Sequence, residues 1–187
     1  MGMMAKDLRF TFSETKALVA LALIAKTRPG LTPLYVAKIM YFAERDHINL
    51  YGRPIVADEY IAMPQGPVPS TIKDFIDEKW NWVEKPEEIE AAISIDKSSR
   101  YARLMPGRGV VDFSVLSDTD RECIERAIRF CVPKSPGDLS SITHRHAAWL
   151  LAPPNRPMDY RLFVDDDNPN KQVILEYMEE NSSVEVL

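Results

Sequence analysis

The segment from Leu34 to Ala43 constrains the fold more than any other part of this chain, because it is apolar almost all the way round a helix. Thr32 and Pro33 precede it as a helix start, with threonine as the capping residue and proline at the first helical position. Gly52 follows as a stop signal. A helix that is apolar on every face is buried on every face. We therefore predict a central helix that the rest of the domain surrounds.

Signals elsewhere in the chain predict shorter elements. Capping residues, prolines and apolar periodicity indicate helices over residues 13–26, 70–79, 86–93, 118–132, 136–149 and 170–180. β-Branched and aromatic residues predict a strand over 55–63, and alternating runs on either side of Pro106 and Gly107 predict a hairpin of 101–105 with 109–113. The expected fold class is α+β and mainly helical: a compact bundle of about six helices around a buried central helix, with a small antiparallel β element.

The charge distribution divides the chain into two parts. Of its 23 basic and 28 acidic side chains, two and eight fall in residues 159–187, so this segment carries −6 and residues 1–158 carry +1. A chain of 187 residues that is 45% hydrophobic is long enough for one compact core. We therefore expect a folded domain over 1–158 and an acidic C-terminal segment over 159–187 that packs on it or trails from it.

The same distribution argues against nucleic acid as a partner. A nearly neutral domain lacks the basic surface that affinity for nucleic acid requires. The order of helix, Pro-Gly turn and second helix permits a helix-turn-helix interpretation. However, Lys38 stands alone among the apolar residues of the would-be recognition helix, without Arg, Asn or Gln to contact base edges. A DNA-binding autoregulator is therefore kept only as an alternative.

Other features are typical of a cytoplasmic protein. No run of about 18 apolar residues occurs, so no membrane span is expected. The first residues also lack the hydrophobic region of a signal peptide. Cys123 and Cys131 lie eight residues apart on one predicted helix, about 12 Å from each other and too far for a disulfide. We expect both to be buried free thiols in a reducing compartment.

His47 continues the helix-face stripe formed by Val36, Met40 and Ala43. This spacing turns its ring toward the core. We therefore expect a buried histidine with a backbone or carboxylate partner. A general base or a polar anchor for a partner is the alternative.

Two further histidines occur in the sequence Thr143-His144-Arg145-His146. A His-x-His pair can bind a transition metal, but a stable site needs three or four ligands, and the third would be His47 or an acid. Because no other metal motif accompanies the pair, we expect no metal and no cofactor. A metal-assisted hydrolase using His47, His144 and His146 is the alternative. His146 falls on a helix stripe that lines the core, whereas His144 faces elsewhere as the candidate polar contact.

The segment Gly66-Pro67-Val68-Pro69 forms a stiff turn. Its two prolines fix the backbone and remove two amide donors. Such a turn either caps the start of a helix at Ser70 or presents Gln65 and Val68 rigidly to a partner. Both roles are compatible, because stiffness lowers the entropy cost of binding.

These motifs, in their order and spacing, resemble the Panacea domain, which is the SocA-like antitoxin family. The resemblance spans residues 13–152 and rests on Lys38-Ile-Met-Tyr-Phe-Ala-Glu-Arg-Asp-His47, Tyr51-Gly-Arg-Pro54, the predicted strand through Asp58 to Met63, Gly66-Pro-Val-Pro69, and Asp138-Leu-Ser-Ser-Ile-Thr-His144 with Trp149. Members of this family are antitoxins encoded beside diverse toxins. The namesake is a proteolytic adaptor that delivers its toxin to the ClpXP protease.

The resemblance implies that residues 1–158 are a Panacea domain and that the protein is an antitoxin of a toxin–antitoxin system. Its partner would be a toxin encoded nearby, and ClpXP would be a second partner if the protein acts as a proteolytic adaptor. Apolar surface on the neutral domain would also permit a homodimer. No catalytic residue is expected. The matching positions are expected to bind the partner or to build the fold: Arg45, His47, Gly66, Pro67, Val68, Pro69, Thr143, His144 and Trp149.

Overall fold

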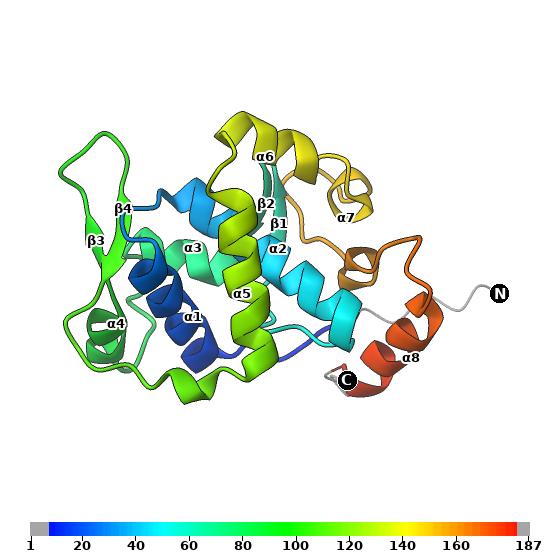
Figure 1. The fold of residues 1–187 in the computed structure, drawn as a ribbon, viewed down its shortest axis with the longest axis horizontal. Helices are drawn as coiled ribbons and strands as arrows, with labels where there is room; N and C mark the ends of the chain where they lie inside the picture. Colours follow the sequence, from blue (N-terminus) through cyan, green and yellow to red (C-terminus); the bar gives the residue numbers. More distant parts are fainter. Residues whose placement is uncertain (1–7, 183–187) are drawn as a thin grey trace.

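In the computed structural model, which describes residues 8–182, helix α2 (Pro33–Tyr51) runs through the middle of the molecule (Figure 1). Pro33 lies in its first turn, as the sequence predicted. Gly52 ends the helix in a left-handed conformation with φ 70°, and its amide donates to the carbonyl of Ile48. Every residue from Val36 to Glu44 is buried. The predicted central helix is therefore confirmed.

Two long helices, α1 and α5, pack beside each other, and α5 also packs along α2 (Figure 1). Helix α1 (Glu14–Thr27) begins at Ser13, whose side chain accepts a hydrogen bond from an amide of the first turn. Helix α5 (Asp118–Cys131) begins with a capping box in which Ser117 and Asp120 each bind the backbone amide of the other. Both starts occur where the capping residues predicted them.

The other helices are short and lie around this core. They are α3 (Ser70–Ile76), α4 (Pro86–Ala92), α6 (Pro136–Thr143), α7 (Ala147–Leu150) and α8 (Lys171–Asn181), with the 3-10 turns η1 (Phe113–Val115) and η2 (Tyr160–Phe163). The helix predicted over 136–149 is interrupted, because His146 has an extended backbone and α7 starts anew after it. Within residues 8–182, eight α-helices and two small sheets confirm the mainly helical α+β class. No helix in this range is long and apolar enough to cross a membrane.

The first sheet pairs β1 (Tyr60–Met63) with β2 (Gly66–Pro69) in antiparallel orientation. Residues 155–158 lie along the other edge of β1, where three backbone hydrogen bonds join them to Tyr60 and Ala62. This edge of the sheet is therefore occupied by the chain itself.

The strand predicted over 55–63 is shorter than expected, because the backbone amides of its first residues donate to the Glu44 side chain and do not pair with another strand. The amides of Ile55, Val56 and Ala57 donate to the Glu44 carboxylate at 2.6 to 3.3 Å. The segment before β1 thus wraps around a buried carboxylate of α2.

The hairpin predicted between 101–105 and 109–113 is wrong. Strand β4 (Arg103–Pro106) pairs instead with the preceding strand β3 (Ile93–Asp96), which follows α4 directly. The residues after β4 turn back onto the end of α4, where a Cβ on Gly107 would collide with the helix backbone. Close packing against a helix, and not a hairpin turn, accounts for this glycine.

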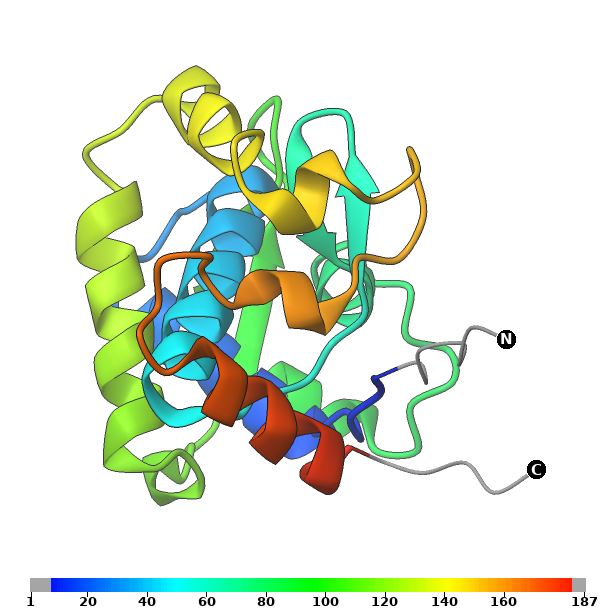
Figure 2. The same ribbon diagram turned by 90° about the vertical axis from the view of Figure 1, so that its right-hand side faces the viewer.

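The C-terminal part of the chain packs against the same core, as Figure 2 shows for α8 beside α2. Phe163 is fully buried, and its ring centroid lies 5.4 Å from that of Tyr41 and 5.5 Å from that of Tyr60. Helix α8 buries Ile174 and Met178. Residues beyond position 158 therefore contribute side chains to the core.

Candidate functional site around the β1–β2 turn

Side chains from three helices hold the turn between β1 and β2. Lys38 of α2 and Ser140 of α6 both donate to the carbonyl oxygen of Gln65, with Nζ at 2.5 Å and Oγ at 2.9 Å. Trp149 of α7 donates through Nε1 to the carbonyl oxygen of Met63 at 3.0 Å. The turn is therefore fixed from outside through its carbonyl groups as well as by its own prolines.

Lys38 is the most unusual of these side chains, because its ammonium group is buried. The residue is 1% exposed, and its Nζ also lies 3.2 Å from Oγ1 of Thr143. Among residues 8–182 no carboxylate forms an ion pair with it, and burial lowers the pKa of Lys38 to about 8. The side chain therefore remains largely protonated at neutral pH and places a positive charge beneath the turn.

The burial of α2 argues against its use as a DNA-recognition helix. A recognition helix must expose its side chains to the edges of the bases in the major groove. Residues 36–44 are buried, and Lys38 binds the protein's own backbone instead. This helix therefore supports the fold and does not read DNA.

Gly66 is the position where the turn leaves no room for a side chain. Its φ of 102° lies in a region that is open mainly to glycine. A Cβ there would also collide with Nζ of Lys38 and with Oγ1 of Thr143. Two of the predicted site residues, Gly66 and Thr143, thus meet around the buried ammonium group.

An apolar groove of about 420 Å³ opens beside the turn, between the first half of α2 and α3. Its walls include Leu34 and Ala37 of α2, Val68 and Pro69 of β2, and Ile72 and Ile76 of α3. Lys38 and Lys73 also line it, and no acidic side chain does. Three of the predicted site residues, Pro67, Val68 and Pro69, therefore form one wall of this groove.

His144 lies on the opposite side of the turn and stacks on Trp149. The centroids of the two rings are 3.8 Å apart at an interplanar angle of 18°. Burial lowers the pKa of His144, which favours the neutral ring, and a contact with the carbonyl of Pro64 opposes this shift. The stack therefore orients the indole that holds the carbonyl of Met63.

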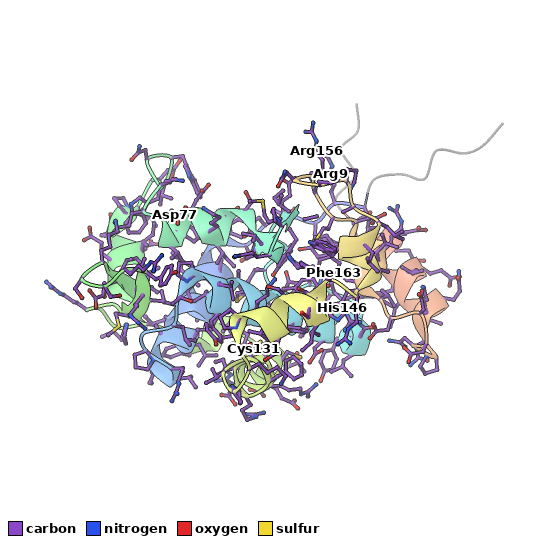
Figure 3. All side chains as sticks on the ribbon, turned by 90° about the horizontal axis from the view of Figure 1, so that it is seen from above. Arg9, Asp77, Cys131, His146, Arg156 and Phe163 are labelled. Carbon is purple, nitrogen blue, oxygen red and sulfur yellow. The ribbon has the colours of Figure 1, made fainter. Side chains whose placement is uncertain are left out.

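His146 is partly buried and contacts core side chains, although the helix stripe that predicted this is interrupted at His146 itself. Its Nδ1 lies 2.9 Å from the hydroxyl of Tyr41, and its ring packs edge-on against Phe42. Figure 3 labels both His146 and Phe163, whose rings contact the same tyrosine. Burial, reinforced by the charge of Arg45, lowers the pKa of His146 to about 4. The ring is therefore neutral at physiological pH.

His47 is fully buried near the other end of α2, which confirms its predicted place on the core face. Its Nδ1 donates to the carbonyl of Arg53 at 2.8 Å, and its Nε2 lies 3.0 Å from Thr119 Oγ1 and 3.1 Å from Asp120 Oδ1. Although burial opposes it, hydrogen bonds from His47 and Lys16 lower the pKa of Asp120. The predicted carboxylate partner thus comes from α5.

Arg45 joins α2 to the C-terminal part of the chain. Its guanidinium forms an ion pair with Asp165. One turn further along, Asn49 donates to the carbonyl of Phe163 at 2.8 Å and accepts from the amide of Asp165 at 2.8 Å. These contacts fix the segment after η2 against the central helix.

The predicted site residues therefore form two separate groups. Gly66, Pro67, Val68, Pro69, Thr143, His144 and Trp149 surround the β1–β2 turn, whereas Arg45 and His47 lie toward the other end of α2. The three histidines occupy different environments, and residues 8–182 contain no group of three or more His, Cys, Asp or Glu side chains placed to bind a metal. The alternative hydrolase site of His47, His144 and His146 is not assembled.

Two buried carboxylates were missed in the sequence. Burial raises the pKa of Glu44 to about 7, although hydrogen bonds from three backbone amides act to lower it. Asp58 accepts the amides of Thr71 at 3.0 Å and Ile72 at 2.8 Å, and so caps α3, whose own N-cap residue is a proline. An acid inside an apolar helix was the available signal for Glu44. Asp58 gave none, because it lies on a different segment from the helix that it caps.

Comparison with known families matches the chain to one of them. The family described as "Antitoxin SocA-like, Panacea domain" matches residues 36–150. This range is more than half of the chain, runs from α2 to the end of α7, and contains all nine predicted site positions. No match was found among curated proteins or among solved structures. The chain belongs to the Panacea-domain family of SocA-like antitoxins.

Proposed function

We propose that this protein is an antitoxin that binds and neutralises a toxin protein encoded near it. The observation that carries the proposal is the family match over residues 36–150. The open groove beside the β1–β2 turn supports it, because an apolar hollow on a fixed framework is a common feature of surfaces that bind other proteins.

The chemistry of the polar side chains also supports a binding function. His47 and His146 each contact a partner inside the protein, and the Glu44 carboxylate is occupied by backbone amides. Groups engaged in this way stabilise the fold and are not directed at a substrate.

Co-expression with the neighbouring open reading frame tests the proposal. We expect that the neighbour alone stops growth, that this protein restores growth, and that the two proteins co-purify. A frameshifted copy of the gene for this protein controls for effects at the RNA level. A neighbour that is harmless alone, or that remains toxic in the presence of this protein, would overturn the proposal.

Delivery of the toxin to ClpXP is a finer version of the same proposal, and it requires its own measurement. If the protein acts as an adaptor, the toxin has a short half-life in cells that contain both proteins, and deletion of the protease abolishes neutralisation. If direct binding is sufficient, neutralisation persists without the protease and the toxin accumulates in a complex.

A further inference from the structure

We propose that the groove beside the β1–β2 turn binds an amphipathic helix of the partner protein, and that this helix carries an acidic residue facing Lys73. This inference rests on the proposed function and names the kind of toxin segment that the antitoxin recognises. Its basis is the closed edges of the β1–β2 sheet, the apolar walls of the groove and the charges that line it.

Addition of a partner strand to the sheet is blocked on both sides. The outer edge of β1 is already paired with residues 155–158. In β2 only Gly66 and Val68 have amides that can pair with β1, so the alternation of the strand directs Pro67 and Pro69 to the open edge. Prolines offer no donor to a new strand. A partner therefore has to bind through side chains and not through backbone pairing.

The walls of the groove fit the apolar face of a helix. Leu34 and Ala37 lie three residues apart on α2, and Val68 of β2 also lines the hollow. A volume of about 420 Å³ has room for several apolar side chains. A helix presents such side chains in a row at positions i, i+3 or i+4 and i+7, which is a common way for a partner to fill an apolar groove.

The apolar surface continues over the turn. Met63 and Pro64 line the groove and also line a second hollow of about 250 Å³ on the other side. Leu150 of α7 borders this second hollow and is 58% exposed. A stable complex buries roughly 800 Å² on each partner, and the two hollows together offer a longer footprint than the groove alone.

The charges of the groove select an acidic partner segment. Lys38 lies beneath the turn without a carboxylate partner among the described residues. Lys73, at the edge of the groove, shares Asp77 with Lys79, so this cluster retains a positive charge (Figure 3 labels Asp77 at the end of α3). The chain as a whole carries −5, so the positive lining is a local property and not a general one. An acid on the partner supplies the opposite charge.

The first test replaces a wall residue of the groove without disturbing the helix that carries it. Leu34→Glu places a carboxylate in the groove. The position is in the first turn of α2, where an acidic side chain interacts favourably with the helix dipole and stabilises the helix. We expect an unchanged melting temperature and a loss of affinity for the purified neighbouring toxin of roughly tenfold or more. Val110→Glu, at a fully exposed valine outside the groove, is the matched control and should bind normally.

The second test reverses the charge at the edge. Lys73→Glu should slow association with the toxin and weaken the dependence of its rate on salt, because charges at the edge of an interface act mainly on the encounter. Lys85→Glu, at an exposed lysine that precedes α4 and does not line the groove, is the control and should leave the association rate unchanged. Equal association rates for the two variants would contradict the proposed acidic residue facing Lys73.

Photo-crosslinking then identifies the occupant. Benzoylphenylalanine at position 34 should crosslink to one toxin peptide with helical apolar spacing and an acid, and the same group at position 110 should not. A crosslink to a second copy of this chain would instead make the groove a homodimer contact and overturn the inference. If the wild-type protein fails to neutralise the toxin, the proposed function fails as well. If it neutralises the toxin and the Leu34→Glu and Val110→Glu variants do so equally, only the groove inference fails.

Discussion

The ammonium nitrogen of Lys38 lies 2.5 Å from the carbonyl oxygen of Gln65, and this hydrogen bond joins the central helix to the tip of the β1–β2 turn. The turn separates the groove from the second hollow, because Met63 and Pro64 line both. The shape of the candidate binding surface therefore depends on a hydrogen bond from a lysine that is only 1% exposed.

The space around this charge makes Gly66→Ala strongly destabilising. The added methyl group would collide with Lys38 and Thr143, and alanine disfavours a φ of 102°. We expect the free energy of unfolding to fall by about 3 kcal/mol, measured by urea denaturation.

Two other glycines separate the causes of that loss. Gly30 has a φ of 85° but nothing within 4 Å of an added Cβ, so Gly30→Ala should cost only about 1 kcal/mol. Gly137 has no positive φ, and its nearest neighbouring atom lies at 3.8 Å, so Gly137→Ala should leave stability nearly unchanged. If Gly66→Ala were as stable as Gly30→Ala, the collision of the added Cβ with Lys38 and Thr143 would not be the cause of the loss.

Glu44→Gln should destabilise the fold although it preserves the size of the side chain. The carboxylate accepts the amides of Ile55, Val56 and Ala57, whereas a glutamine directs its own donors at part of this set. Leaving buried donors without acceptors costs about 2 to 4 kcal/mol here. Thermal unfolding checks this, with Glu59→Gln at an exposed position as the control. Equal melting temperatures for the two variants would show that the amides do not need the charge.

His146 should make the protein less stable in acid. Its pKa is about 4 in the folded protein against an ordinary value of 6.5, so the unfolded chain binds the proton more readily. Its contribution to stability is therefore complete above pH 6.5 and is lost as the pH falls from 6.5 toward 4. In His146→Gln, which keeps an acceptor for the Tyr41 hydroxyl, the free energy of unfolding should decline less over this range. Parallel pH profiles of the two proteins would contradict the assignment.

His144 should act through the ring that it stacks on. Loss of the 3.8 Å stack in His144→Ala should lower the free energy of unfolding by about 1 kcal/mol. His144→Phe keeps an aromatic ring against Trp149, and we expect it to retain both the melting temperature and the neutralisation of the toxin. Normal stability combined with lost neutralisation in His144→Phe would instead make the imidazole a contact for the partner.

The boundary predicted at residue 158 can be tested by truncation. A chain that ends at Met158 lacks Phe163, which is fully buried against Tyr41 and Tyr60. Loss of such a side chain costs about 3 to 5 kcal/mol, so this chain should melt far below the full-length protein. A chain that ends at Pro169 keeps Phe163 and should melt higher than the shorter one. Calorimetry of both chains decides where the folding unit ends.

Local signals in the sequence predicted the helices well. Ser13, Ser117 and Gly52 act within a turn or two of their own positions, so their effect can be read without knowledge of the fold. The place of His47 on the core face was equally predictable, because helical periodicity alone decides it.

Contacts between distant segments were not predictable in this way. The alternation around Pro106 and Gly107 suggested a hairpin with residues 109–113, but β4 pairs with the preceding strand β3. A local pattern does not show which of these two segments pairs more favourably with β4. In the candidate site, the prolines indicated a stiff turn. That Lys38, Ser140 and Trp149 would bind the carbonyls of this turn depends on how α2, α6 and α7 pack.

Three polar side chains of α2 bind three different neighbours. Lys38 binds the β1–β2 turn, Glu44 binds the segment before β1, and His47 contacts α5. If the helix slid by one turn along its axis, all three groups would be buried without partners, and apolar contacts alone would not offset that loss. Apolar side chains can pack against the core in many positions of the helix. The three polar contacts are all satisfied in only one of these positions. The central helix thus discriminates among competing packings of its own chain.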